Sequence, residues 1–389
     1  MNIFENSKKL KSFLKDIYGA EDVLLHRPIF FGNEKQYLSE CIESNFVSSV
    51  GARVIEFETN IANFVGASNG IATVNGTLAL HAALLVCGVK RGDEVISQAL
   101  TFVATSNAIT YTGATPVFVD VDIDTLGMSP TALRSWLKKN THRRSGETYN
   151  KTSGARISAC VPMHTFGLPC RIKEIADICK EYNLVLIEDS AESLGSYVDN
   201  LHTGSFGACS IFSFNGNKII TTGGGGMIVT NNKIIAQKAK HLTTTSKIGH
   251  AYEYFHDEVG YNYRLPNLNA ALGVAQMENI YQILKSKRKI ASKYRKFCSQ
   301  NDLNFIEPIE NTTSNFWLNA ILLENLEERD CFLKETNSLG IMTRPIWRLM
   351  TELPMYLDCQ NDGLQNAKWL VDRVVNVPSS VPEADIRTK

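Results

Sequence analysis

Short apolar segments alternate with segments of helical periodicity between residues 71 and 230, and this alternation constrains the fold more than any other feature of the chain. Strands that alternate with helices form a mainly parallel sheet with helices on both faces. The sequence therefore predicts an α/β fold, preceded by a helix from residue 52 that Gly66 ends. The expected strands are residues 71–74, 94–98, 116–121, 158–163, 184–188, 209–214 and 227–230, and the expected helices are residues 78–87, 102–111, 130–138 and 172–182.

The pattern changes in two places. A polar stretch over residues 138–156 is predicted to be an exposed loop. Past residue 268 the sequence predicts a long helical stretch over 268–298, whose basic run 285–289 is best explained as a solvated helix face. A strand over 315–323 and a helix over 327–338 follow. We therefore expect an N-terminal arm (1–34), a large domain (35–269) and a small C-terminal α/β domain (270–389).

Composition excludes some partners. The chain has 389 residues, 44% of them hydrophobic, which is enough for a large core and two domains. Its 40 basic and 40 acidic residues leave no excess charge that would suit nucleic acid or a membrane surface as the main partner. No apolar run has the length of a signal peptide or a membrane span. The nine scattered cysteines are typical of a reducing compartment, so we expect a cytoplasmic protein.

A first candidate binding site is Asn75-Gly76-Thr77, which lies between an expected strand and an expected helix. A helix N-terminus has free backbone N–H groups and the positive end of the helix dipole. Glycine lets an anion approach the backbone, and the threonine hydroxyl adds a donor. This arrangement suits a phosphate group. An ordinary N-cap made by Thr77 explains the same residues equally well.

Asp189 is a second candidate, because it directly follows the apolar run 184–187 and Glu188. In open α/β sheets, ligands bind at the carboxyl ends of the strands. An acid at this position is well placed to meet a ligand. The alternative is that Asp189 only caps the turn that follows.

Lys218 is the third candidate and lies in the stretch SFNGNKIITTGGGGMI. The four glycines are not a Walker-type phosphate loop, because no Gly-Lys-Ser/Thr follows them, but they allow close approach of the backbone to a ligand or a neighbouring chain. A lone lysine is usually a surface charge. A lysine in apolar surroundings, however, loses its proton more readily and becomes a usable nucleophile. The apolar neighbours in sequence are Phe212, Phe214, Ile219 and Ile220.

Together the three candidates fit pyridoxal phosphate. This cofactor needs a lysine to carry it, a carboxylate for its pyridine nitrogen and an anion site for its phosphate. Lys218 would carry the cofactor, and Asp189 would keep the ring nitrogen protonated. The helix that begins near Gly76 would bind the phosphate.

Several motifs, in the same order, resemble the DegT/DnrJ/EryC1/StrS family of sugar-nucleotide aminotransferases over almost the whole chain. They are NGTLALHAALLVCGVKRGDEVI, TFVATSNAITYTGATPVFVDVD, IEDSAESLGS, GSFGACSIFSFNGNK and GYNYRLPNLNAALG. The EDSAES and FNGNK forms look most like the branch that aminates UDP-linked 4-keto-6-deoxy-N-acetylhexosamines.

The resemblance implies the architecture of PLP-dependent transferases of fold type I and a homodimer whose active sites are shared between subunits. It implies that Gly76, Thr77 and Ser213 hold the cofactor phosphate, and that Asn262 reaches the phosphate from the partner subunit. Phe102 would stack on the cofactor ring.

One position departs from the pattern of the family. Many relatives have His or Gln where this chain has Glu192. A glutamate can hydrogen-bond the phenolic oxygen of the cofactor only if one of the two groups carries the proton. A dehydratase subset of the family has His in place of Lys218, so the lysine of this chain argues against that activity.

The implied reaction transfers an amino group from L-glutamate to the C4 ketone of a nucleotide-linked 4-keto-6-deoxy sugar. The first candidate substrate is UDP-2-acetamido-2,6-dideoxy-4-keto-hexose, and the product is a 4-amino sugar for surface polysaccharide or nonulosonic acid synthesis. GDP-4-keto-6-deoxymannose and a 3-keto sugar nucleotide are the alternatives. A PLP-binding regulatory protein without turnover is the alternative from another class.

Contacts to the sugar are harder to predict. Arg344 and Trp347 are candidates because this loop approaches substrate in the family, although packing in the small domain explains them equally well. His164 follows a strand and is a third candidate, although a structural histidine explains it better. Three further histidines, His241, His250 and His256, are spread out without metal-ligand spacing, so no metal is predicted.

Overall fold

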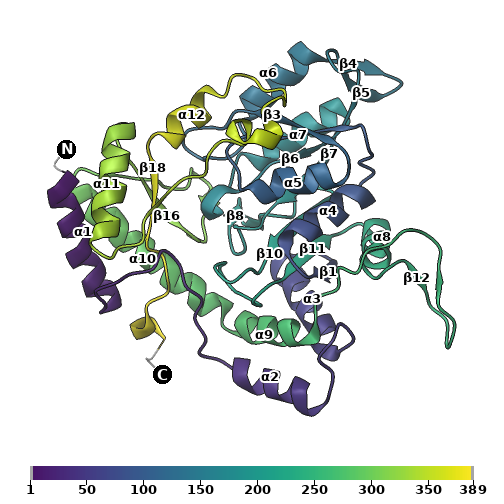
Figure 1. The fold of residues 1–389 in the computed structure, drawn as a ribbon, viewed down its shortest axis with the longest axis horizontal. Helices are drawn as coiled ribbons and strands as arrows, with labels where there is room; N and C mark the ends of the chain where they lie inside the picture. The colour runs from purple at the N-terminus through teal and green to yellow at the C-terminus, as the bar shows by residue number, and fades with distance from the viewer. Residues whose placement is uncertain (1–2, 387–389) are drawn as a thin grey trace.

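The computed structural model describes residues 3–386, and its centre is a nine-stranded sheet. Seven of the strands follow the order β1-β11-β10-β7-β6-β2-β3 (Figure 1). Neighbouring strands pair in parallel except at β11, which is antiparallel to both β10 and β1. The predicted mainly parallel sheet is therefore confirmed. The strands are β1 Asn69–Thr73, β2 Glu94–Gln98, β3 Thr115–Val119, β6 Arg156–Val161, β7 Val185–Asp189, β10 Cys209–Ser213 and β11 Gly226–Thr230.

Helices cover both faces of this sheet, because successive strand residues point to opposite sides. Val95 of β2 belongs to a hydrophobic cluster with α4, α5 and α8, whereas the adjacent Ile96 belongs to a cluster with α6 and α7. Near β1 and β11 the second face is covered by α3 and α9. The helices are α3 Ala52–Val65, α4 Gly76–Val86, α5 Val103–Tyr111, α6 Pro130–Asn140, α7 Ile172–Tyr182, α8 Lys233–Thr243 and α9 Asn267–Glu278.

The prediction of a loop over residues 138–156 is wrong. This stretch forms an antiparallel hairpin of β4 Thr141–Arg144 and β5 Glu147–Asn150, and β5 also pairs with β6. Ser145 and Gly146 both have positive φ, which suits the tight two-residue turn of a hairpin. The hairpin is tied to the sheet because the buried Asn150 donates a hydrogen bond of 2.6 Å to Glu94.

The C-terminal part is built on a second, antiparallel sheet of four short strands in the order β14-β16-β18-β17. The predicted helical stretch forms α9 and α10 Ile280–Gln300, which separate at Asn279. The strand predicted over 315–323 is shorter, because the chain reaches β16 only after Phe316, whose φ is positive. The elements are β14 Asn304–Phe305, β16 Asn319–Leu322, α11 Leu326–Ser338, β17 Arg344–Pro345, α12 Gln365–Val371 and β18 Val374–Val377.

The N-terminal residues are not an extended arm throughout. Helix α1 Ile3–Tyr18 buries Leu10 and Leu14 and lies beside α11 at the left of Figure 1. Helix α2 Glu34–Glu43 packs on α9. The three domain ranges from the sequence stay a proposal, and the proposed boundary after residue 269 falls inside α9.

The basic run 285–289 is not a solvated face at every position. Lys285 and Lys289 are exposed, but Lys287 is fully buried. In the part of the chain that the structure describes, no helix is both long enough and apolar enough to span a membrane.

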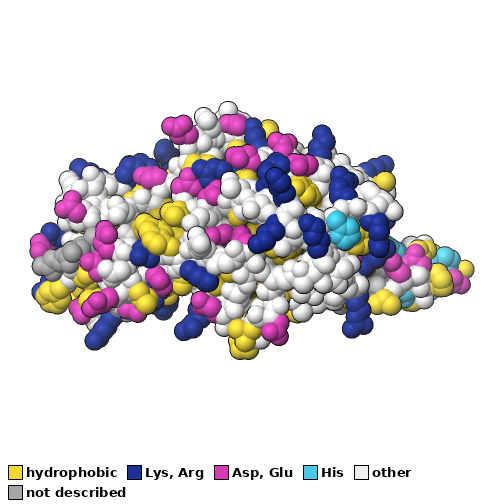
Figure 2. Space-filling view, turned by 90° about the horizontal axis from the view of Figure 1, so that it is seen from above, with side chains coloured by type: hydrophobic (Ala, Val, Ile, Leu, Met, Phe, Trp, Pro, Cys, Tyr) yellow, Lys and Arg dark blue, Asp and Glu magenta, His cyan; other side chains and the backbone are white. Residues whose placement is uncertain are grey.

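A slender projection extends from the body after α8, at the right of Figure 1 and of the space-filling view in Figure 2. It contains the short strands β12 Lys247–Ile248 and β13 Phe255–His256. Large side chains on it face solvent, and Tyr252 and Tyr254 are 81% and 82% exposed. Such exposed apolar groups are typical of a surface that contacts another molecule.

Candidate active site

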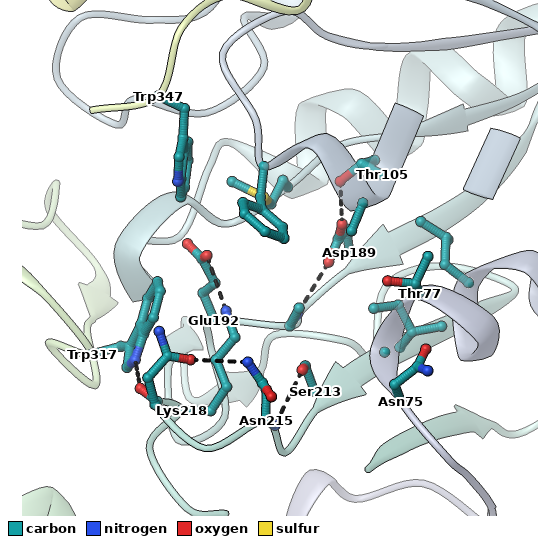
Figure 3. Close-up of a pocket in the computed structure, with 18 residues that line it drawn as sticks. Asn75, Thr77, Thr105, Asp189, Glu192, Ser213, Asn215, Lys218, Trp317 and Trp347 are labelled. Carbon is teal, nitrogen blue, oxygen red and sulfur yellow. Dashed lines mark hydrogen bonds and ion pairs between the residues drawn. The ribbon is translucent and has the colours of Figure 1, made fainter. Parts of the chain in front are cut away.

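A cavity of about 350 Å³ lies at the carboxyl ends of β7 and β10, which is where ligands bind in open α/β sheets. The N-terminus of α4 closes one end, and two tryptophans from the C-terminal part close the other (Figure 3). Eight residues predicted for the site line the cavity: Gly76, Thr77, Phe102, Asp189, Glu192, Ser213, Lys218 and Trp347.

The end of the cavity formed by α4 is suited to an anion. Asn75 is the N-cap, and its side chain accepts a hydrogen bond of 2.9 Å from the N–H of Leu78. The expectation that Thr77 caps the helix is therefore wrong, and the hydroxyl of Thr77 lies at the cavity instead (Figure 3). A Cβ placed on Gly76 would come within 2.9 Å of the Cβ of Ser213, so only glycine fits without a shift.

Asp189 ends β7 and is buried at the floor of the cavity. Its Oδ2 accepts a hydrogen bond of 2.7 Å from the hydroxyl of Thr105, and its Oδ1 accepts one of 3.2 Å from the N–H of Ala191. Burial raises the pKa of Asp189, and these two hydrogen bonds oppose the rise. The carboxylate is thus held in one orientation by donors from α5 and from the following turn (Figure 3).

Lys218 does not lie in purely apolar surroundings, as its sequence neighbours suggested, because Phe212 and Phe214 turn into the core. Its Nζ lies 3.1 Å from Oε1 of Glu192 and 3.9 Å from the ring centroid of Trp317. Burial raises the pKa of Glu192, and the neighbouring Lys218 opposes the rise. The amine therefore lies between a carboxylate and an aromatic face.

Two predicted sugar contacts do not reach the cavity. His164 is fully buried behind the sheet end, with its Nε2 3.2 Å from Oε2 of Glu188 and its Nδ1 accepting a hydrogen bond of 3.2 Å from the N–H of Cys170. These contacts match the structural alternative, and the proposed contact with substrate is withdrawn. Arg344 is exposed, and its guanidinium donates to Asn337 and to the carbonyl of Thr343.

Asn262 also lies outside the cavity of its own chain. It is exposed near the base of the projection, and its Oδ1 accepts a hydrogen bond of 3.0 Å from Arg264. The expected role in the site of a partner subunit stays a prediction.

The absence of a metal also stays a prediction. His241, Asp257 and Glu258 bring their side-chain ligand atoms within 4.8 Å of one another, a grouping that histidine spacing in the sequence does not reveal.

Several residues of the site were missed from the sequence. Thr105, which orients Asp189, belongs to a motif of the resemblance but has no distinctive spacing. Asn215 and Asn217 lie just before Lys218 in the sequence and could have been included on that ground. For Trp317 the sequence holds no signal, because nearly one hundred residues separate it from Lys218.

The residues that line this cavity fit pyridoxal phosphate. The crowded contact between Gly76 and Ser213 keeps the first turn of α4 free of a side chain, so the phosphate can approach the backbone N–H groups. Asp189 would face the ring nitrogen, and Lys218 would carry the cofactor at the opposite end. A fold of type I with this arrangement defines a PLP-dependent enzyme.

Comparison with known proteins agrees with this class. The model of the DegT/DnrJ/EryC1/StrS aminotransferase family matches residues 30–385. The chain belongs to this family and is a PLP-dependent sugar aminotransferase, as the sequence motifs implied.

The relatives are similar over most of their length. GDP-perosamine synthase of Escherichia coli O157:H7 is 37% identical, with 91% of this chain and 92% of that protein covered. The putative pyridoxal phosphate-dependent aminotransferase EpsN of Bacillus subtilis is 36% identical, with 86% and 84% covered. Among solved structures, an aminotransferase from Psychrobacter cryohalolentis has a TM-score of 0.79 and 26% identity, with 93% and 95% covered.

Proposed function

We propose that this protein transfers an amino group from L-glutamate to the C4 ketone of GDP-4-keto-6-deoxymannose. The aminotransferase chemistry rests on the placement of Lys218, Glu192 and Asp189 around one cavity. The choice of nucleotide rests on the relative from Escherichia coli O157:H7, whose name denotes a GDP-linked amino sugar. UDP-2-acetamido-2,6-dideoxy-4-keto-hexose is the second candidate, favoured by the EDSAES and FNGNK motifs. A 3-keto sugar nucleotide, which no contact of the cavity favours, ranks behind both.

Pyridoxal phosphate supplies the carbonyl that takes up the amino group and the ring that stabilises negative charge at the reacting carbon. Asp189 keeps a proton on the pyridine nitrogen. The amine of Lys218 would take the proton from Cα of the donor in the first half of the reaction. In the second half it would deliver a proton to C4 of the sugar. A base on a tethered side chain is held in the required geometry in both halves.

The lining of the cavity away from α4 supports sugar binding. Trp347 and Phe102 present aromatic rings, and Asn215 and Asn217 present amide groups. Aromatic faces pack on the apolar faces of sugar rings, and neutral amides can both donate to and accept from hydroxyl groups. The amides carry no charge, so the groups that bind the nucleotide phosphates must lie outside this part of the cavity.

A substrate panel tests the proposed sugar. The purified enzyme is given L-glutamate with GDP-4-keto-6-deoxymannose, with the UDP-linked N-acetyl sugar or with a 3-keto sugar nucleotide, and the amino sugar is identified by mass spectrometry. We expect kcat/KM to be at least about tenfold higher for the GDP-linked sugar. A preference for the UDP-linked sugar would replace the first candidate with the second.

An absorbance spectrum separates an enzyme from a binding protein without any sugar. The cofactor band of the purified protein should shift when L-glutamate is added, since the first half of the reaction needs no acceptor. A band that persists with every amino donor would favour the regulatory alternative. A response to another amino acid would change only the donor.

We further propose a homodimer in which Asn262 completes the site of the partner subunit. Its exposed position and the exposed aromatic groups on the neighbouring projection support this proposal. Mixing inactive Lys218→Ala and Asn262→Ala subunits should restore about a quarter of the activity, because half of randomly formed dimers are mixed and each has one complete site. No recovery after verified subunit exchange would contradict shared sites.

A further inference from the structure

The amine of Lys218 contacts a group for which the expected chemistry provides no role. Besides Glu192, its Nζ lies over the indole ring of Trp317, 3.9 Å from the centroid. An ammonium group over an aromatic face is stabilised by the negative charge of that face, and the effect grows when water is excluded. Trp317 is 4% exposed and Glu192 is buried as well. A carboxylate and an aromatic face, two groups that can hold an ammonium, therefore border the amine.

Three hydrogen bonds fix Trp317 in this position. Its indole N–H donates over 2.6 Å to the carbonyl of Asn217, next to Lys218. Its backbone N–H donates over 2.8 Å to Oδ1 of Asn315. Its carbonyl accepts a bond of 2.8 Å from Nζ of Lys287. Two other segments thus hold the ring and the carbonyl of Trp317, and its own turn holds the amide.

The segment around Trp317 holds Glu192 too. The side-chain amide of Asn315 donates to the carbonyl of Glu192 over 2.8 Å and to that of Leu194 over 2.9 Å. Asn315 is fully buried. One turn of chain therefore sets the distance between the carboxylate and the aromatic face that flank the amine.

Lys287 anchors this turn in an unusual way. Its side chain is fully buried and donates to two carbonyls, those of Trp317 and Ser379. Within the described residues it makes no ion pair with a carboxylate. A buried lysine without a countercharge costs stability. We infer that the chain tolerates this cost because the hydrogen bond from Lys287 holds Trp317 in a fixed position.

We propose that Trp317 and Glu192 form a resting site for the ammonium form of Lys218, and that Lys287 positions Trp317 for this role. The amine takes up the proton from the substrate carbon and moves into the resting site as an ammonium. It leaves the site when it returns the same proton, so no other proton donor or oxidant is needed. The inference rests on the aminotransferase reaction and does not depend on which sugar is the substrate.

Two other titratable groups face the amine. Asp189 lines the same cavity, and its carboxylate, like that of Glu192, attracts the ammonium group of Lys218. His26 lies behind Asn217, and burial lowers the pKa of His26 well below its usual value, so it is neutral. The control variants leave both groups in place.

Covalent capture of pyridoxal phosphate by the cofactor-free protein tests the resting site. Only the unprotonated amine adds to the aldehyde, with loss of one water, so the capture rate rises with pH. Trp317→Leu should lower the pH of half-maximal rate by about half to one and a half units, because the ammonium loses a stabilising contact. Trp317→Phe keeps a weaker aromatic face and should give a value between those of Trp317→Leu and the wild-type protein.

Trp369→Leu is the matched control. The guanidinium of Arg373 lies over the ring of Trp369 at 4.5 Å, so this variant also loses a cation–π pair, but Trp369 does not line the cavity. The pH at which this variant captures the cofactor at half its maximal rate should equal that of the wild-type protein. Fluorinated tryptophan, incorporated throughout the chain, weakens the aromatic face without changing its shape. The half-maximal pH should then fall with each added fluorine even if Trp317→Leu does not fold.

Lys287→Met tests the anchor. If Lys287 positions Trp317, the half-maximal pH falls in the same direction as in Trp317→Leu, by a smaller amount. If Lys287 only stabilises the fold, the melting temperature drops and the half-maximal pH does not move. An unchanged half-maximal pH in both the fluorinated protein and folded Trp317→Leu overturns the resting site. Failure of the wild-type protein to capture the cofactor would instead overturn the role of Lys218.

Discussion

The two walls of the active-site cavity are built in different ways. On the wall formed by the central sheet and α4, Asp189 and Ser213 are the last residues of β7 and β10, and Gly76 begins α4. On the opposite wall, Trp317 and Trp347 come from irregular segments before β16 and after β17. Regular elements hold the groups expected to meet the pyridine nitrogen and the phosphate, whereas irregular segments hold Lys218 and the two tryptophans.

This difference suggests a division of labour. A strand end is fixed by the ladder of the whole sheet, so a group there keeps its position while substrates change. An irregular segment is fixed by a few specific contacts and tolerates substitution more readily. Variants of Asp189 should therefore impair chemistry, and variants of the two tryptophans should adjust binding and proton transfer.

The largest effect is expected from Lys218→Ala. The variant loses both the group that carries the cofactor and the base, so turnover should fall by about 10⁴-fold or more. Circular dichroism should show an unchanged fold, since the side chain is only partly buried. Appreciable turnover would remove this lysine from the mechanism.

Asp189→Asn should follow, with kcat lower by about 10²- to 10³-fold. The amide oxygen can still accept from Thr105, but a neutral group cannot keep the ring nitrogen protonated. Urea unfolding should show much less change than kcat. An unfolded variant would instead indicate that Asp189 serves mainly as a cap.

On the second wall, Trp347→Ala should raise KM for the sugar nucleotide about tenfold and change kcat little. The Trp347 ring packs against Phe166, with centroids 5.1 Å apart, and lines the cavity. The spectral response to L-glutamate, which needs no sugar, is the internal control. An equal loss in that response would show that Trp347 supports the cofactor and not the sugar.

The smallest effect concerns the anchor of the second wall. Burial lowers the pKa of Lys287 well below its ordinary value of 10.5. Between the lowered value and 10.5 the unfolded chain binds one more proton than the folded chain, so the free energy of unfolding rises with pH. The slope is at most about 1.4 kcal/mol per pH unit.

Lys287→Met should lack this contribution. Urea unfolding at pH 7 and pH 9 measures it as the difference between wild-type and variant slopes, which cancels the other titrating groups. Parallel slopes would mean that Lys287 keeps its charge in the folded protein.

Local pattern was enough to predict most of the large domain and its wall of the cavity. The predicted strand 94–98 and helix 172–182 match β2 and α7 residue for residue. Asp189 was found because it follows an apolar strand, and the ends of parallel strands meet at one edge of a sheet. Lys218 was found from its apolar neighbours in sequence, although Phe212 and Phe214 turn into the core. The alternation of strands and helices, the cofactor and the family were therefore available from the sequence alone.

Tertiary structure alone decided what distant segments bring together. Lys287 looks like its exposed neighbours in sequence, yet the carbonyls of Trp317 and Ser379 enclose it. Likewise, nothing local places the indole of Trp317 over the amine of Lys218. The physical reason is that periodicity reports which face of an element is apolar, whereas burial and contact of a polar group depend on how separate elements pack.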